Sequence, residues 1–159
     1  MLETKIIVDT NIIINGLFFS NKYPYDVELL KMIEKKSVNL IISTDIDKEI
    51  RDTVMMIAKI KKYSLDKFDE KIYCKINNCL NLATKVFPRI KTNYSKHSLD
   101  NKFIDAVIES GSSYLISNNI DLTEITDNIQ DMYNFKICSP FQFKLFVASK
   151  NVRIKFNKK

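Results

Sequence analysis

Asp9 is an acidic residue placed between two apolar segments. The stretch KIIVDTNIIINGLFF begins at Lys5, and Asp9 ends its first apolar run, before Thr10 and Asn11 introduce the second. A carboxylate that leaves water without a partner is among the most costly groups to bury. Two explanations are open: Asp9 holds a divalent metal ion, or it caps a helix formed by the second run. Asp9 alone does not favour the metal over the cap.

A second group of polar residues follows another short apolar segment. Asn118, Asn119 and Asp121 come directly after SYLIS (113–117), which is predicted to be a strand. The loops at the carboxyl ends of parallel strands meet in one crevice. We therefore expect Asp9 and this second group to lie at the same edge of a sheet.

Asp100 lies near the start of a helix predicted over residues 98–111. It shares the apolar stripe of that helix with Ile104 and Val107, so its side chain is predicted to face the body of the protein. A first-turn acid favoured by the helix dipole would explain its place but not its orientation. Asp105 lies far round the helix from Asp100 and is predicted to be a solvent-exposed acid.

Two more acids flank the apolar stripe of a helix predicted over residues 44–60, which Thr44 or Asp45 would cap. Glu49 and Asp47 lie on opposite sides of the stripe at similar angles, so periodicity does not choose between them. Each one, taken in isolation, is interpreted as a surface charge.

A divalent metal ion would explain several acids in one crevice. Such carboxylates repel one another, and burial raises their pKa values further. Mg²⁺ or Mn²⁺ takes oxygen ligands, and the chain has one His and three Cys without metal-site spacing, so zinc is disfavoured. A bound ion of this kind can activate water for attack on phosphorus. The acids therefore favour phosphodiester hydrolysis.

Short strands alternate with helices along the chain. Apolar runs predict strands at TKIIVD, VNLIIS, SYLIS and FKICS. Periodic or capped segments predict helices over residues 24–36, 44–60, 64–87, 98–111 and 140–149, and a helical or irregular segment over 11–19; residues 89–98 are predicted to be a loop. This alternation indicates an α/β sandwich around a mostly parallel sheet. The stripe of the 44–60 helix is predicted to end at Ile60.

Composition indicates a globular chain. We expect one domain over residues 1–150, followed by a basic tail over 151–159. The net charge of +6 slightly favours a polyanionic partner. The apolar start is interrupted by Asp9, Asn11 and Asn15, and no apolar stretch reaches the roughly 18 residues of a membrane span, so we expect a cytoplasmic protein that is not in the membrane. The three cysteines are expected to be reduced and partly buried.

Four segments, in order, resemble the signature segments of PIN-domain proteins. They are IIVDTNIIINGL, STDIDKEI, SLDNKFIDAVIESGSSYLISNNIDL and ICSPFQFKLF, and they span almost the whole chain. The resemblance is closest to the small prokaryotic PIN proteins related to VapC-type toxin ribonucleases. It implies a three-layer α/β/α sandwich with a central, mostly parallel sheet, and a Mg²⁺- or Mn²⁺-dependent endoribonuclease. It also implies the toxin of a toxin-antitoxin pair, with an antitoxin protein as a partner, and a homodimer.

The resemblance assigns the site residue by residue. It makes Asp9, Glu49 and Asp100 the catalytic acids and metal ligands, and so favours Glu49 over Asp47. The basic side chains of Lys22, Arg51 and Lys102 are then expected to meet the backbone of single-stranded or structured RNA.

One position departs from the family pattern. Where the pattern resembles Thr-Gly-Asp-x-Asp-Leu, this chain has SNNIDL, which places Asn119 at the usual fourth acid. Asn11 matches the polar position beside the first acid, and Ser117 matches a hydroxyl residue after the strand. Asparagine brings no negative charge, and Asn119 or Asp121 is expected to complete the metal shell. The alternative is a PIN-like module with weakened catalysis that only binds RNA or a protein partner.

Overall fold

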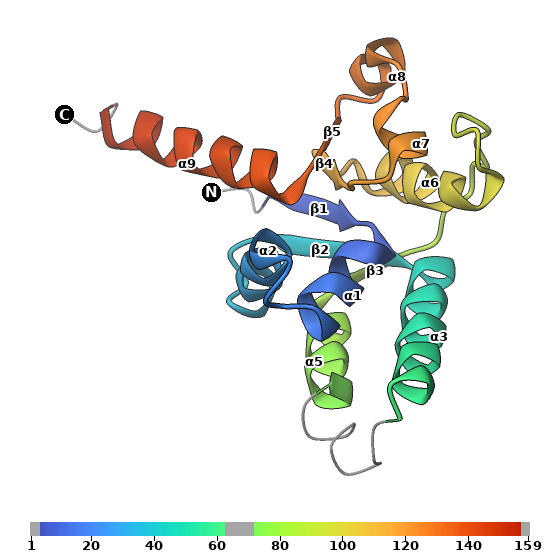
Figure 1. Cartoon of the computed structure of the whole chain (residues 1–159). Coiled ribbons are helices and arrows are strands. Elements are labelled where there is room, and N and C mark those ends of the chain that lie inside the picture. Colours follow the sequence, from blue (N-terminus) through green and yellow to red (C-terminus); the bar gives the residue numbers. More distant parts are fainter. Residues whose placement is uncertain (1–3, 63–71, 157–159) are drawn as a thin grey trace.

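A computed structural model describes residues 4–62 and 72–156 (Figure 1). At its centre lies a five-stranded sheet in the order β3-β2-β1-β4-β5, in which every pair of neighbouring strands is parallel. The strands are β1 (Lys5–Val8), β2 (Asn39–Ser43), β3 (Thr84–Val86), β4 (Tyr114–Ile116) and β5 (Lys136–Cys138). β3 and β5 are therefore the edge strands.

Helices cover both faces of the sheet. Figure 1 shows α1, α2, α3 and α5 on one side and α6, α7 and α8 on the other. Their bounds are α1 (Thr10–Phe18), α2 (Pro24–Glu34), α3 (Thr44–Ile60), α5 (Cys74–Leu82), α6 (Asn101–Ser110), α7 (Ile120–Thr123), α8 (Asp127–Met132) and α9 (Pro140–Phe156), with a 3-10 turn, η2 (Ser98–Asp100), before α6. The predicted three-layer α/β/α sandwich is confirmed.

Each inner strand carries a run of consecutive buried apolar residues because helices bury both faces of the sheet. Ile6, Ile7 and Val8 of β1 are buried, and Ile6 pairs with Leu40 of β2 on one side and Tyr114 of β4 on the other. Such strands lack the alternation of apolar and polar residues that is typical of a sheet with one exposed face. This packing fixes the end of β1, and with it the position of Asp9.

Polar side chains set the starts of α3 and α9. Ser43 caps α3 by accepting a hydrogen bond from the Ile46 N–H at 3.3 Å, so the prediction of Thr44 or Asp45 as the cap is wrong. At α9, Ser139 Oγ accepts from the Gln142 N–H, and Gln142 Oε1 accepts from the Ser139 N–H. This reciprocal capping box holds the start of the last helix.

Two sequence predictions of secondary structure and burial are corrected. The helix predicted over 64–87 ends at Leu82, and Thr84–Val86 form β3 beside β2; residues 64–71 of that prediction lie outside the described residues. Ile60, predicted to belong to the apolar stripe of α3, is 70% exposed. Ala58 is the buried residue of the last turn of α3 instead, which the predicted stripe does not reveal.

Three further expectations concern the tail, the membrane and the thiols. α9 takes in residues 151–156, and the division into a 1–150 domain and a 151–159 tail stays a prediction. Among the described residues, every helix is too short or too polar to cross a membrane. The three cysteines are free, as expected: Cys74 is exposed, whereas burial raises the pKa of the Cys79 and Cys138 thiols to about 12.

Candidate functional site

The candidate site lies at the carboxyl ends of the central strands. Asp9 follows β1 directly, and Ser117 follows β4, the neighbouring strand. Ser117 Oγ donates a hydrogen bond of 2.6 Å to Asp9 Oδ2. The two predicted polar groups therefore meet at one edge of the sheet, although 108 positions separate these residues.

Asp9 is both a helix cap and a buried acid. Its backbone is extended, and its Oδ1 accepts from the Asn11 N–H at 3.2 Å, so the capping interpretation is confirmed. Asn11 contributes this backbone N–H, while its side chain is exposed. The second oxygen of Asp9 is left for Ser117, which means that capping and a functional role use different atoms of one carboxylate.

The electrostatic environment of Asp9 disfavours its ionised form. Burial raises the pKa of the Asp9 carboxyl, the hydrogen bonds from Ser117 and Asn11 lower it, and the negative charges of Asp100 and Glu49 raise it again. The net direction is upward. Asp9, Glu49 and Asp100, which we call the acid site, are thus close enough to interact through their charges.

Asp100 is the last residue of the turn η2 and is half-buried. Its Oδ2 accepts a hydrogen bond of 2.8 Å from Asn119 Nδ2, and His97 Nδ1 lies 3.9 Å from the same oxygen. Burial raises the pKa of the Asp100 carboxyl, His97, Asn119 and the Lys102 charge lower it, and the Asp121 charge raises it. The inward orientation predicted for Asp100 agrees with its 14% side-chain exposure.

Asn119 uses both ends of its amide. Its Nδ2 donates to Asp100, and its Oδ1 accepts from the Asp121 N–H at 3.0 Å, which caps α7. The Asn119 N–H in turn donates to Ser117 Oγ at 2.9 Å. A continuous path of hydrogen bonds therefore runs from Asp9 through Ser117 and Asn119 to Asp100.

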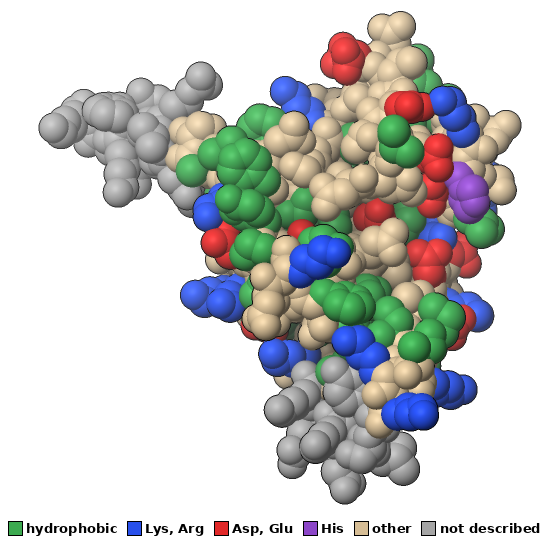
Figure 2. All heavy atoms as spheres, viewed as in Figure 1, with side chains coloured by type: hydrophobic (Ala, Val, Ile, Leu, Met, Phe, Trp, Pro, Cys, Tyr) green, Lys and Arg blue, Asp and Glu red, His purple; other side chains and the backbone are tan. Residues whose placement is uncertain are grey.

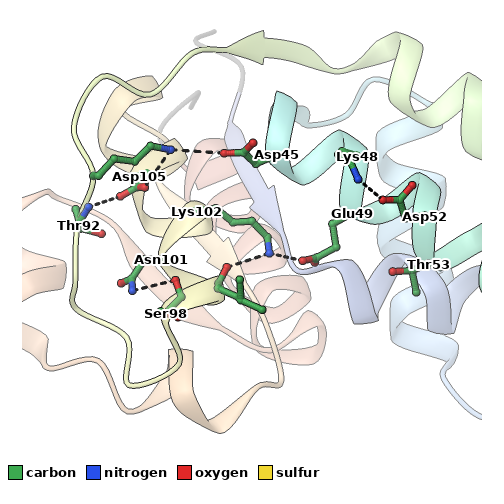
Figure 3. Close-up of a pocket in the computed structure, with 12 residues that line it drawn as sticks. Asp45, Lys48, Glu49, Asp52, Thr53, Thr92, Ser98, Asn101, Lys102 and Asp105 are labelled. Carbon is green, nitrogen blue, oxygen red and sulfur yellow. Dashed lines mark hydrogen bonds and ion pairs between the residues drawn. The ribbon is translucent and has the colours of Figure 1, made fainter.

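Glu49 and Asp47 point in different directions from α3. Glu49 Oε1 accepts a hydrogen bond of 2.5 Å from Thr10 Oγ1, and Glu49 Oε2 forms an ion pair with Lys102 (Figure 3). Asp47 instead forms ion pairs with Arg51 at 2.8 Å and Lys85 at 3.5 Å. The structure thus separates two acids that helical periodicity leaves equivalent.

The three basic residues expected to meet RNA have different surroundings. Lys102 contacts Glu49, whereas Arg51 binds Asp47 and also donates to Asn77 at 2.8 Å. Lys22 is exposed and lines a pocket of about 280 Å³. Figure 2 shows acidic and basic side chains interspersed over one face of the molecule. Positive charge is therefore not concentrated in one patch on that face.

A pocket of about 530 Å³ opens beside Glu49 and Lys102 (Figure 3). Helices α3 and α6 and the loop before η2 form its walls. Its lining consists of Asp45, Lys48, Glu49, Asp52, Thr53, Lys91, Thr92, Ser98, Leu99, Asn101, Lys102 and Asp105. The pocket therefore adjoins the acid site through Glu49 rather than enclosing all three acids.

Sequence reasoning missed two buried polar residues of α6. Asn101 Oδ1 accepts from the backbone N–H groups of Tyr94 and Ser95, each at 2.9 Å. The prediction that Asp105 is solvent-exposed is wrong: Asp105 is buried, and its carboxylate accepts from the Thr92 N–H at 2.7 Å. The loop over residues 89–98 thus folds back over α6 and is held there by these two side chains.

Thr10 is also absent from the predicted site. It is buried, and its hydroxyl orients Glu49 from the first turn of α1. A polar residue between two apolar runs, next to Asp9, was the one available signal. Its partner could not be found from spacing because Glu49 lies 39 positions away.

The donor atoms of the acid site suit a hard cation. Asp9, Glu49 and Asp100 offer carboxylate oxygens, which Mg²⁺ and Mn²⁺ prefer. Among the residues that the structure describes, no three His, Cys, Asp or Glu side chains are grouped closely enough to count as a formed metal site. The chemistry of the donors fits a divalent ion, and one of them, Glu49, is engaged by Lys102.

Comparisons with known proteins agree with this fold. The sequence matches the PIN-domain family over residues 5–121. The fold resembles the crystal structure of VapBC2 from Rickettsia felis bound to a DNA fragment from their promoter, with a TM-score of 0.52, 15% sequence identity, and coverage of 84% of this chain and 97% of that chain. A search of curated proteins found no significant match.

Proposed function

This chain belongs to the PIN-domain family, and we propose that it is a Mg²⁺- or Mn²⁺-dependent endoribonuclease that hydrolyses phosphodiester bonds of RNA. PIN domains are generally nucleases and generally use divalent metal ions. The observation that carries the proposal is the environment of Asp9. This buried carboxylate is crowded by the charges of Asp100 and Glu49 at the carboxyl edge of a parallel sheet.

Such crowding favours a bound cation. Burial raises the pKa of Asp9, the charges of Asp100 and Glu49 raise it further, and a divalent ion would offset both effects. Asp9, Glu49 and Asp100 would hold the ion, with Asp121 as a fourth acid. The negative charge of Asp121 raises the pKa of the Asp100 carboxyl, which supports this role for Asp121. When bound, the ion would supply positive charge to the phosphoryl oxygens and would acidify the attacking water.

The chain's own residues would keep the acids in fixed orientations. The Ser117 hydroxyl holds one oxygen of Asp9, the Thr10 hydroxyl holds one oxygen of Glu49, and the Asn119 amide holds one oxygen of Asp100. Outer hydrogen bonds of this kind orient metal ligands and tune their basicity. Each acid side chain is therefore held in one orientation before a substrate binds.

RNA is the proposed substrate, single-stranded or structured. Lys22, Arg51 and Lys102 are the proposed contacts to its phosphates, and the net charge of +6 supports a polyanionic partner. Arg51 and Lys102 would have to exchange their present carboxylate partners for phosphate. Lys22 is exposed and would turn toward phosphate at lower cost.

An antitoxin protein is the proposed partner, which would make this chain the toxin of a toxin-antitoxin pair. The likeness to the VapBC2 structure supports this partner at the level of the fold. A homodimer and a cytoplasmic location are part of the same proposal.

The test is cleavage of a fluorophore-labelled single-stranded RNA in Mn²⁺, with the same reaction in EDTA as a blank. The wild-type protein should cut, and Asp9→Asn should not, because the variant keeps the shape of the side chain but removes its charge. The matched control is Asp52→Asn, which removes an acid from an exposed site on α3. Cutting that survives Asp9→Asn in a contaminant-free preparation would refute the proposal.

Asn119 favours a second candidate, a PIN-like module with weakened catalysis that only binds RNA or a protein. The Asn119 amide donates a hydrogen bond to the Asp100 carboxylate and brings no negative charge of its own. This candidate predicts RNA binding by the wild-type protein without cleavage and without a rise in melting temperature in Mn²⁺. An active metal site would instead gain about 2.7 kcal/mol of stability at a hundredfold excess over the dissociation constant.

A further inference from the structure

Lys102 forms an ion pair with Glu49, one of the three acids of the candidate site. Its ammonium pairs with Glu49 Oε2 and also donates to the Leu99 carbonyl at 2.9 Å. Figure 3 shows Lys102 extending from α6 toward Glu49 on α3. The Lys102 side chain is only 14% exposed, whereas that of Glu49 is 34% exposed. This is a sheltered contact between two helices and differs from the exposed Lys48–Asp52 pair in the same pocket.

The positive charge of Lys102 acts on more than one acid. Lys102 follows Asp100 by two positions, and its charge lowers the pKa of the Asp100 carboxyl. Its ammonium also lies 5.0 Å from the centre of the Phe103 ring, which is buried. The amine is therefore held by a carboxylate, a carbonyl and an aromatic face, all next to the acid site.

Glu49 has no carboxylate oxygen that is without a partner in this arrangement. Thr10 occupies Oε1 and Lys102 occupies Oε2. A divalent ion that uses Glu49 as a ligand must share an oxygen with one of these two donors. The Lys102 contact is the one that a stronger positive charge would displace, because two cations repel each other at a shared oxygen.

We propose that Lys102 is a built-in counter-cation of the acid site, which competes with the divalent ion for Glu49 and thereby lowers the metal affinity of the protein. The proposal rests on the proposed metal-dependent function. Lys102 is a positioning residue here: it holds Glu49 in the metal-free protein and leaves it when the ion binds. The pocket of about 530 Å³, which Lys102 already lines, gives the displaced ammonium a solvated position.

The direct test is calorimetric titration of metal-free protein with MnCl₂, comparing the wild type with Lys102→Met and Lys102→Arg. Lys102→Met should bind Mn²⁺ at least about fivefold more tightly, the lower end of the usual coupling between two binding events. Lys102→Arg keeps the charge and should stay close to the wild type. The matched control is Lys48→Met, which removes a lysine from the same pocket and should leave the affinity unchanged.

Thermal melting separates competition from a merely structural role. Lys102→Met should melt below the wild type in EDTA, because Glu49 loses its partner. In saturating Mn²⁺ the difference should shrink or reverse, since tighter binding adds more stability. A structural role alone would keep the same difference in both conditions. Lys102→Gln serves as a second neutral variant if Lys102→Met does not fold.

The outcomes are distinguishable from failure of the proposed function. If the wild type binds Mn²⁺ and the neutral variants bind it equally or more weakly, the role of Lys102 is overturned and the metal site stands. If the wild type binds no Mn²⁺ but Lys102→Met does, the competition is supported in its strongest form. If no variant binds Mn²⁺, the metal-dependent function and the inference fail together.

Discussion

Asn119 Nδ2 donates a hydrogen bond of 2.8 Å to Asp100 Oδ2, so this asparagine stabilises the ionised form of an acid beside it. An aspartate at position 119 could not do so, because two ionised carboxylates at this separation repel each other. The same asparagine caps α7 through its other amide atom. Asn119 therefore stabilises the site in the absence of a metal ion, but it does not supply the negative charge that would attract one.

Asn119→Asp should exchange stability for metal affinity. Aspartate caps helices as well as asparagine does, so α7 should keep its start. The lost hydrogen bond and the new repulsion should lower the free energy of unfolding in EDTA by about 1–3 kcal/mol. Mn²⁺ affinity and RNA cleavage should both rise. Urea unfolding in EDTA and in Mn²⁺ measures the first effect, and calorimetric titration measures the second.

Asn118→Asp is the matched control, because it adds the same charge one position earlier on an exposed side chain. It should change the free energy of unfolding little in either condition. A destabilisation of Asn119→Asp that Mn²⁺ fails to relieve would contradict the role of the Asn119 amide in balancing Asp100.

The free energy of unfolding in EDTA should fall as the pH rises above 4. The pKa of Asp9 is raised from its ordinary value of 3.8, chiefly by burial, so the folded protein keeps this proton to a higher pH than the unfolded chain does. Between those two pKa values the folded state binds more protons, and stability therefore falls with rising pH. Each unit of difference corresponds to about 1.4 kcal/mol. Asp100 contributes in the same direction.

Asp9→Asn removes this titration and should make the pH dependence above pH 4 shallower, leaving the contribution of Asp100. Asparagine still caps α1, and the Ser117 hydroxyl can turn to accept from the new amide. At pH 8 in EDTA the variant should be more stable than the wild type, as denaturant titrations at each pH would measure. An unchanged pH profile would show that Asp9 titrates normally. Asp52→Asn, at an exposed site, should keep the wild-type profile.

Ser117→Ala should weaken both the fold and the site. Ser117 is fully buried, and its hydroxyl donates to Asp9 and accepts from the Asn119 N–H. Loss of a hydrogen bond to a charged group costs about 1.5–3 kcal/mol. Removal of the donor should also raise the pKa of Asp9 further, so Mn²⁺ affinity should drop most at mildly acidic pH. Thermal melting and calorimetric titration at pH 5.5 and 7.5 measure these effects, with exposed Ser113→Ala as the control.

Gly111→Ala should destabilise the protein by about 1–2 kcal/mol for a conformational reason. Gly111 ends α6 in the left-handed region, with φ of 61°, and an added Cβ would meet no atom within 4 Å. Backbone strain is therefore the cost, and steric overlap is not. Gly111→Asn should lose less, because asparagine tolerates this region. Equal losses for the two variants in chemical denaturation would argue against this explanation.

The central strands were predictable because burial on both faces leaves a visible apolar run. β1, β2 and β4 have such runs, whereas β3 does not: Thr84 and Lys85 are exposed, and the strand has only three residues. The apolar periodicity of α5 continues up to that point, which favours a helix through residue 87. Short edge strands depend on their neighbour, here β2, and carry little signal of their own.

Contacts between distant elements were also beyond the sequence. Helical periodicity correctly predicted that Asp100 faces inward. It wrongly predicted that Asp105 is exposed to solvent, because a helical wheel contains no information about the loop that covers the helix. Likewise, Lys102 and Glu49 are 53 positions apart and meet only because α6 packs beside α3. Acids between apolar runs can be found by inspection, whereas the pairing of Lys102 with Glu49 requires the fold.

The two borders of the sheet have a consequence for the behaviour of the protein in solution. The edge strands β3 and β5 have three residues each. Each of them carries one exposed lysine, Lys85 on β3 and Lys136 on β5. A neighbouring molecule that added a strand there would gain few hydrogen bonds and would meet like charge. Strand-by-strand polymerisation through these two borders is therefore disfavoured.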